Sequence, residues 1–375
     1  MTENARNVLL LCQLDGFANS VKPLEIERFL RARGHAVRMV DTYYLSRASA
    51  RRGSVLSKLP ALRPRKLVLY AVEVALAAFT RRWRVGRRRL SYTLLRAECA
   101  VRASILANEL RPDDYDLVVS ETPHDAWTLT SPTQARTLYD CPTPWADELY
   151  DDGRLTEQQH RKLRRLEAEL FERVDHLSFH WESYARYAVE RYGISGHNLL
   201  TLNFGCTPAP SRAQFRAPPR VIYFGSLAGK AIDLPLLSRL ARRYPHIDVY
   251  GGPAPDPALG LKYCGYAQPS ILANYQFGLI TSSNDELRQH GFSAKHPQYL
   301  AYGLPVLVPT WRREMELGGS VPYDEESFSA VVERLSDERE WRRVSDEAYE
   351  QARRLDWNET LRPLDALLRE LPKRP

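Results

Sequence analysis

Short apolar runs alternate with amphipathic stretches along the first half of the chain. The runs are five or six residues long and suit strands of a parallel sheet that is covered on both faces. The intervening amphipathic stretches predict helices. We expect strands at residues 7–12, 36–40, 116–120, 136–140, 176–180 and 198–203, and helices at residues 24–33, 157–174 and 182–192. This order of elements is typical of a doubly wound α/β domain.

The same alternation restarts after a proline-rich stretch. Residues 207–219 contain four prolines and predict a linker. Beyond it we expect strands at residues 220–226, 247–250, 275–281 and 306–308, and helices at residues 234–244, 325–335, 338–355 and 360–371. The whole pattern predicts an α/β protein with two Rossmann-like doubly wound domains that face a cleft. We place the domains at residues 1–210 and 211–357, with a helix in residues 358–375 packing back on the first domain.

One stretch of the second half, residues 290–309, combines a Gly-Phe-Ser turn, about three turns of predicted helix and an apolar strand. Lys295, Gln298 and Tyr302 have the spacing that places them on one helical face. A helix that opens after small residues presents unpaired N–H groups and the positive end of its dipole, which suits a phosphate. A lysine in the first turn adds positive charge, although a solvent-facing lysine is the structural alternative. The pattern therefore predicts that a diphosphate is held here.

The composition is that of a soluble globular protein, with 44% hydrophobic and 26% charged residues in a chain of 375. Its five cysteines are scattered, with no C-x-x-C spacing. This indicates reduced thiols in the cytoplasm and argues against a zinc site, so we expect no metal. We also expect no signal peptide, and no apolar run reaches the roughly 18 residues that a membrane-spanning helix needs.

The net charge of +7 is unevenly distributed. Residues 47–102 contain 15 Lys and Arg against two acidic residues, whereas the remainder contains 38 basic and 44 acidic residues. Within this segment an apolar stretch, residues 67–79, is flanked by arginines on both sides, with Trp83 at its border. This pattern is typical of a segment that lies on an anionic membrane surface. An ordinary helix with a solvated basic flank and, less favoured, a nucleic-acid patch are the alternatives. We expect a cytoplasmic protein, peripheral on the inner face of the plasma membrane.

Two motifs of the second half resemble the GT-B glycosyltransferases. Phe224-Gly225-Ser226 is similar to the strand and Gly-Ser that open their C-terminal domain, and residues 301–306, Ala-Tyr-Gly-Leu-Pro-Val, are similar to their Ala-x-Gly-x-Pro-Val motif. Retaining members often carry two glutamates at positions that are His290 and Gln298 here. The missing pair favours an inverting reaction.

A third pattern, Ser293-x-Lys295-x-x-Gln298-Tyr299, resembles the membrane-associated β-glucuronosyltransferases of the xanthan type. In those enzymes the serine, lysine and glutamine contact the nucleotide diphosphate. The resemblance implies a nucleotide-sugar co-substrate, in the first place a UDP-sugar, and no cofactor. Together with the Gly-Ser loop of the GT-B motif, this pattern gives the expected donor-binding residues: Gly225, Ser226, Ser293, Lys295, Gln298 and Tyr299.

An inverting transfer also needs a base for the acceptor hydroxyl. Polar residues at the expected carboxyl ends of first-domain strands are Asp15, Glu121, His124, Asp140 and Asp147. In the xanthan-type enzymes the base is an aspartate shortly after a strand end, and the similar stretch here, residues 138–147, contains an apparent insertion. The resemblance favours Asp147, with Asp140 next, although each has the alternative of an ordinary loop or cap residue.

The sequence thus predicts a metal-independent glycosyltransferase that acts on a saccharide or lipid-linked acceptor, as in polysaccharide biosynthesis. Two alternatives stay open. One is a retaining GT-B transferase that glycosylates a soluble natural product, and the other is a non-catalytic GT-B scaffold that binds a nucleotide sugar.

Overall fold

The computed structural model describes residues 5–12, 14, 21–41, 97, 99–100, 103, 110–195, 199–227, 231–312 and 316–372. The predicted membrane-facing segment, residues 47–102, lies almost entirely outside these residues. The chain divides into two compact units, one formed by Met1–Asn203 with Leu361–Pro375 and the other by Phe204–Thr360. We refer to them as unit 1 and unit 2.

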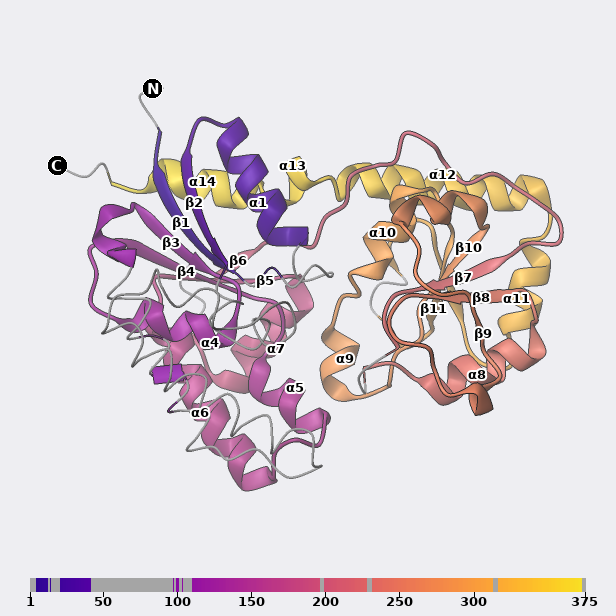
Figure 1. Ribbon diagram of the computed structural model, residues 1–375, viewed down its shortest axis with the longest axis horizontal. Helices are drawn as coiled ribbons and strands as arrows, with labels where there is room; N and C mark the ends of the chain where they lie inside the picture. The colour runs from indigo at the N-terminus through magenta and orange to yellow at the C-terminus, as the bar shows by residue number, and fades with distance from the viewer. Residues whose placement is uncertain are drawn as a thin grey trace, which may run out of the picture. The chain divides into compact units, whose positions relative to one another are not determined.

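Unit 1 is built on a six-stranded parallel sheet in the order β2-β1-β3-β4-β5-β6 (Figure 1). From β1 the chain first builds outward to β2 and then returns to add β3 on the other side of β1. Ligands of open α/β sheets collect at such a switch point, outside the carboxyl ends of the strands. The strands are β1 (Asn7–Cys12), β2 (Ala36–Asp41), β3 (Leu117–Ser120), β4 (Arg136–Cys141), β5 (His176–Phe179) and β6 (Leu199–Thr201).

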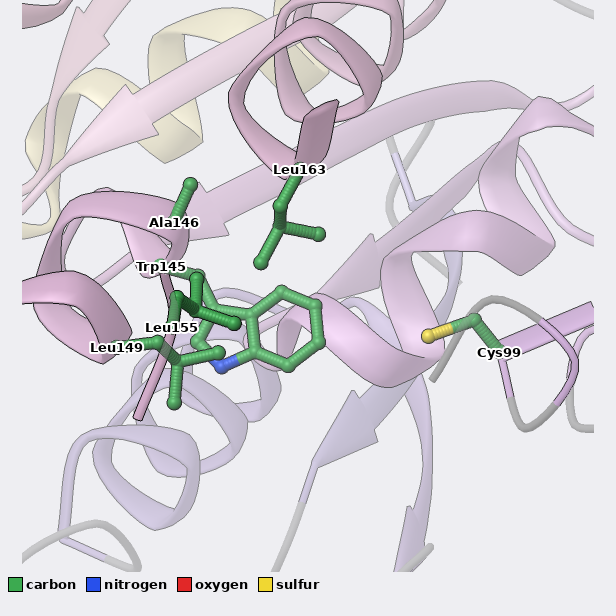
Figure 2. Packing of buried hydrophobic residues seen from close by; sticks show 6 residues of the cluster. All are labelled: Cys99, Trp145, Ala146, Leu149, Leu155 and Leu163. Atoms are coloured by element: carbon green, nitrogen blue, oxygen red, sulfur yellow. The ribbon is translucent and has the colours of Figure 1, made fainter. Parts of the chain in front are cut away.

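The described helices of unit 1 are α1 (Val21–Ala32), α4 (Pro123–Ala126), α5 (Trp145–Asp151), α6 (Glu157–Arg173), α7 (Glu182–Tyr192) and α14 (Arg362–Glu370). Thr156 and Gln159 begin α6 with a reciprocal capping box. Figure 2 shows the buried Trp145 ring of α5 among Leu149, Leu155 and Leu163, and this contact seats α5 against α6.

The last helix belongs to unit 1 through contacts with the start of the chain. The Arg6 guanidinium donates hydrogen bonds to the carbonyls of Leu368, Leu371 and Pro372. Asp365 of α14 also lies close to Arg33 and His35, which follow α1. Unit 1 is therefore assembled from both ends of the chain.

Unit 2 repeats the architecture with a parallel sheet in the order β12-β11-β10-β7-β8-β9 (Figure 1). Its switch point lies between β7 and β10. The strands are β7 (Val221–Phe224), β8 (Ile247–Tyr250), β9 (Lys262–Tyr263), β10 (Phe277–Leu279), β11 (Val306–Pro309) and β12 (Ser320–Tyr323). The helices are α8 (Leu234–Arg243), α9 (Glu286–His290), α10 (Lys295–Ala301), α11 (Phe328–Arg334), α12 (Glu338–Arg354) and α13 (Trp357–Thr360).

The stretch expected as a linker, residues 207–219, is hydrogen-bonded within unit 2. The Ala209 N–H donates to the Ala301 carbonyl at 2.8 Å, and the Ala213 N–H donates to the Tyr302 carbonyl at 2.9 Å. On the other side, the Tyr349 hydroxyl of α12 donates to the Ala209 carbonyl at 3.0 Å. The prolines thus belong to an extended segment that packs on α10 and α12.

The predicted fold class is confirmed: the protein is α/β, with two Rossmann-like doubly wound parallel sheets. The central strands of both sheets are buried, as their apolar runs require; Leu9, Leu10 and Leu11 of β1, for example, are fully buried. None of the described helices has the length and apolar character needed to cross a membrane.

Candidate active site

The first part of the candidate site lies at the switch point of unit 2, where Gly225 directly follows β7. Its φ of 144° is a conformation that favours glycine. A Cβ at this position would also come within 2.6 Å of the Lys295 side-chain Cε. Glycine at this position therefore avoids backbone strain and leaves room for the Lys295 side chain in its present position.

Lys295 is the first residue of α10 and places its ammonium 5.3 Å from the centre of the Tyr223 ring. Within the part of the chain that the structure describes, the ammonium forms no hydrogen bond and no ion pair. The side chain keeps some exposed surface, yet burial of the ammonium, with a further contribution from the Arg312 charge, lowers the pKa of Lys295 to about 8. A desolvated ammonium without a carboxylate partner is poised to bind an anion.

Arg312 is a second buried cation at the same edge of the sheet, three residues beyond the end of β11. It is only 3% exposed, and its guanidinium donates to the Gly291 carbonyl at 3.1 Å. Arg312 lies outside the sequence motifs that predicted the other residues of the site. The available signal was a basic residue shortly after a buried strand, at the edge where Gly225 also lies.

The helix that carries Lys295 is shorter than expected. It has seven residues, from Lys295 to Ala301, rather than about three turns. Pro297 gives the physical reason, because a proline without an N–H fits only in the first turn of a helix. The helix therefore begins at Lys295. Tyr302 is its C-cap and does not continue a helical face with Lys295 and Gln298.

The other predicted donor residues lie around the same edge. Ser226 follows Gly225 and is exposed, Gln298 is half-buried on α10, and the Ser293 carbonyl accepts a hydrogen bond from the His296 N–H at 2.9 Å. Tyr299 is fully buried; its hydroxyl accepts from the Phe224 N–H at 2.9 Å and donates to the Leu279 carbonyl at 3.3 Å. Tyr299 thus ties β7 to β10 at the switch point. The roles of these residues as donor ligands stay predictions.

In unit 1, the candidate base Asp140 is fully buried near the carboxyl end of β4. Its Oδ2 lies 2.6 Å from the Lys22 ammonium, and the Ser178 hydroxyl donates to its Oδ1 at 2.7 Å. His180 lies 3.6 Å from the same Oδ2. Burial alone would raise the pKa of the Asp140 carboxyl, but the Lys22 and His180 side chains hold it well below its usual range. Such a carboxylate is a weak base and is better suited to fixing Lys22.

The other candidate base, Asp147, joins three helices. It lies on α5 and is 4% exposed. His160 of α6 contacts its Oδ1, and the hydroxyls of Tyr187 and Tyr192 on α7 each donate to its Oδ2 at 3.0 Å. An acceptor hydroxyl would have to displace one of these partners, and the catalytic role of Asp147 stays a prediction.

The remaining base candidates are less fully described. Asp15 and the side chain of His124 lie outside the described residues. Glu121 directly follows β3, at the switch point of the sheet. No group of three or more metal-ligating side chains occurs among the described residues.

No protein-family model and no curated protein matches the chain. Solved structures match it along nearly its whole length. A sucrose-phosphate synthase from Thermosynechococcus elongatus is 12% identical, with a TM-score of 0.68, over 98% of this chain and 99% of its own. HepE from Anabaena, in complex with UDP and glucose, is 13% identical, with a TM-score of 0.62, over 98% of this chain and 100% of its own. A glycosyltransferase from Rickettsia africae is 11% identical, with a TM-score of 0.61, over 99% of this chain and 100% of its own.

These neighbours are GT-B glycosyltransferases, and their match covers both doubly wound units. The chain has the GT-B fold. At these identities the fold is what is shared, so the chemistry has to be argued from this chain's own residues. The GT-B resemblance of the sequence motifs is confirmed at the level of the fold, and the narrower xanthan-type resemblance stays a prediction.

Proposed function

We propose that this GT-B protein is a glycosyltransferase that moves a sugar from a nucleoside-diphosphate donor to a hydroxyl acceptor. The observation that carries the proposal is the Lys295 ammonium at the switch point of unit 2, which lies against Gly225 and has no acidic partner among the described residues. When a nucleotide sugar reacts, negative charge accumulates on the leaving diphosphate. Lys295 and the neighbouring Arg312 are placed to stabilise that charge.

For the donor, we propose a UDP-sugar. The structure of HepE contains UDP and glucose, and the pattern from Ser293 to Tyr299 is similar to one that contacts a nucleotide diphosphate in the xanthan-type enzymes. We further propose that Lys295 and Arg312 make a metal ion unnecessary. Both side chains are positively charged at neutral pH, so they supply the charge compensation that a divalent cation provides in other transferases.

We propose an inverting reaction on a saccharide or lipid-linked acceptor at the inner face of a membrane. The inverting course is supported by His290 and Gln298, which stand where retaining relatives have glutamates. The membrane-associated acceptor is supported by the sequence of residues 47–102, with their 15 basic and two acidic side chains. The test is flotation with phosphatidylglycerol vesicles and with phosphatidylcholine vesicles. We expect salt-sensitive binding to the anionic vesicles only, and equal or absent binding to both would favour a soluble acceptor.

Nucleotide binding is the first test of the proposed function. UDP, GDP and dTDP are titrated into the protein and into Lys295→Ala and Arg342→Ala. Arg342 is the matched control, an exposed cation on α12 of the same unit that pairs with Glu338. Loss of a charge-assisted phosphate contact should weaken binding about 10- to 100-fold in Lys295→Ala and leave Arg342→Ala unchanged.

Turnover separates the remaining possibilities. Hydrolysis or transfer from the sugar form of the bound nucleotide is the expected outcome. If none of the three nucleotides bound, the proposed function would be wrong. Binding without hydrolysis or transfer would instead identify a non-catalytic scaffold, and a product with the donor's anomeric configuration would identify a retaining enzyme.

A further inference from the structure

Glu121 occupies the switch point of unit 1, the position in this sheet where a ligand is most expected. It is the first residue after β3, and its N–H donates to the carbonyl of Leu11 in β1 at 3.2 Å. The Glu121 backbone thus links β1 and β3, the two neighbouring strands between which the direction of sheet building reverses. A side chain that starts here lies at the carboxyl edge of the central strands.

The charged groups around Glu121 are already paired with one another. The Lys22 ammonium of α1 lies 2.6 Å from the Asp140 carboxylate, as an ion pair, and donates to the Leu202 carbonyl at 2.7 Å. Beyond Asp140 lie Ser178 of β5 and His180, which follows that strand. On the other side, the Thr122 hydroxyl donates to Asp125 of α4 at 2.6 Å. Lys22 and Asp140 are near enough to affect the Glu121 carboxyl electrostatically, but neither forms an ion pair or hydrogen bond with it among the described residues.

Besides Asp140 Oδ2, which is ion-paired with Lys22, two buried oxygens at this edge have no hydrogen-bond donor among the described residues. They are Oε1 of Glu121 and Oδ1 of Asn203, the residue after the Leu202 carbonyl that Lys22 binds. Nearly all buried polar atoms in folded proteins are paired, and leaving one unpaired is energetically costly. Both oxygens require a donor, and a hydroxyl-rich ligand such as a saccharide supplies donors without adding charge.

We propose that the Glu121 carboxylate takes up the proton of the acceptor hydroxyl, in an acceptor subsite that Asn203 and the Lys22–Asp140 pair complete. The assignment rests on the proposed glycosyl transfer. The acceptor O–H bond breaks and its proton goes to Glu121, while the acceptor oxygen bonds to the anomeric carbon of the donor. The bond from that carbon to the phosphate oxygen breaks, and its electron pair leaves with the nucleoside diphosphate.

The alternatives in unit 1 fit this step less well. Both oxygens of Asp147 are held by His160, Tyr187 and Tyr192, and Asp140 is held by Lys22. Burial and the negative charge of Asp140 raise the pKa of Glu121 well above its usual range, although Lys22 opposes the shift. A carboxylate with higher proton affinity is the stronger base.

The test compares three variants. Glu121→Gln should lower kcat about 10²- to 10⁴-fold and leave the affinity for UDP unchanged, because the nucleotide is bound by unit 2. Glu157→Gln is the matched control, the same chemical change at an exposed position on α6, and should keep full activity. Glu121→Asp keeps a titrating carboxylate and reports on the site even if the glutamine variant fails to fold; it should retain a reduced kcat that rises with pH.

The pH profile provides a readout that a structural role would not move. Wild-type kcat should rise with pH as Glu121 loses its proton, and this limb should be absent in Glu121→Gln. Asp140→Asn removes the charge that raises the pKa of Glu121 and leaves Lys22 in place, so the limb should move to lower pH.

Three results would overturn the assignment: full activity of Glu121→Gln, a limb that persists in it, or a limb that stays in place in Asp140→Asn. Loss of activity in Asp147→Asn with an active Glu121→Gln would move the base to Asp147. Failure of the wild-type protein to bind any nucleoside diphosphate is a different outcome, because it refutes the proposed transferase rather than the choice of base.

Discussion

The Lys295 side chain runs across the position that a Cβ of Gly225 would occupy, with its Cε 2.6 Å from that point. The loop after β7 and the first residue of α10 are therefore in close contact. Tyr299, one turn further along α10, hydrogen-bonds the end of β7 as well. Gly225 limits the space for the Lys295 side chain, whereas Tyr299 ties the helix that carries Lys295 to β7. Changes to Gly225 and to Tyr299 should therefore affect anion binding in ways that can be told apart.

Gly225→Ala should weaken UDP binding at least tenfold. The new methyl would displace Lys295, and the φ of 144° adds backbone strain on the order of 1–3 kcal/mol. Gly260→Ala in the same unit is the control, since it also has a positive φ, of 65°, but its Cβ would meet only the Arg242 Nε at 3.7 Å. Calorimetric titration and thermal unfolding of both variants measure the two effects. Equal UDP affinity in the two variants would show that the approach of Lys295 to Gly225 does not matter for binding.

Nucleotide affinity should fall as the pH rises through about 8. Burial lowers the pKa of Lys295 to about 8, so above that pH the unliganded protein carries a neutral amine and must take up a proton to bind phosphate. One proton taken up on binding gives about a tenfold change in Kd per pH unit. Lys295→Arg should remove the dependence, because a guanidinium does not titrate in this range. A pH dependence that survives in Lys295→Arg would assign the titration to another group.

Tyr299→Phe should lower stability more than it lowers nucleotide affinity. The substitution leaves the Phe224 N–H without its acceptor in the protein interior, which costs roughly 1–3 kcal/mol in the free energy of unfolding. Tyr266→Phe serves as the control, because Tyr266 is 72% exposed. Denaturant unfolding and UDP titration are compared for both variants. A loss of affinity as large as that of Lys295→Ala, with unchanged stability, would instead indicate that the Tyr299 hydroxyl contacts the ligand.

The free energy of unfolding of unit 1 should fall as the pH rises from about 4.5 to about 7, because the buried Glu167 carboxyl loses its proton in this range. Burial raises the pKa of Glu167 to about 7, even though its carboxylate accepts hydrogen bonds from the Trp145 and Ala146 N–H groups and from Tyr192. The folded state then binds more protons than the unfolded state in this window, so the free energy of unfolding falls with rising pH, by on the order of 3 kcal/mol.

Glu167→Gln should remove that part of the pH dependence, whereas Glu157→Gln, an exposed change on the same helix, should keep it. The measurement is the free energy of unfolding at several pH values for the wild type and both variants. Parallel stability curves for the wild type and Glu167→Gln would contradict the prediction.

Turnover should continue in the presence of EDTA. Lys295 and Arg312 are proposed to supply the positive charge at the leaving diphosphate, so removal of divalent cations should leave kcat within about twofold of its original value. The check is a kinetic assay with EDTA followed by excess Mg²⁺. Abolished activity that Mg²⁺ restores would show that the two side chains are insufficient.

The sequence predicted most of the fold because buried parallel strands appear as apolar runs between helical periods. The strands Asn7–Cys12 and Ile247–Tyr250 have the expected bounds, and so does the helix Glu182–Tyr192. Two edge strands were not predicted, each for a different reason. Lys262–Tyr263 has only two residues, and Ser320–Tyr323 contains a proline, which is tolerated at a sheet edge but weakens the strand pattern.

The candidate site was less accessible to sequence reasoning, because its contacts join residues that are far apart in the chain. The motifs assign Lys295 and Gly225 to one site but do not include Arg312, whose position depends on the order of β10 and β11 in the sheet. The ion pair of Asp140 also joins residues far apart in the chain. Lys22 lies on α1 and Asp140 on β4, and only the folded structure shows that Asp140 neutralises the Lys22 charge. Burial, which sets the pKa of Glu121 and of Glu167, likewise exists only in three dimensions.

The bonds from Arg6 to the carbonyls around α14 have a consequence for the order in which the chain can fold. During synthesis unit 2 leaves the ribosome as one continuous segment, whereas the first sheet must wait for residues 361–372 before its covering is in place. The strand synthesised first is thus among the last to be secured. A nonsense mutation at residue 361 would leave every residue of unit 2 in place and still remove the partners of Arg6, beside the first strand of the other unit.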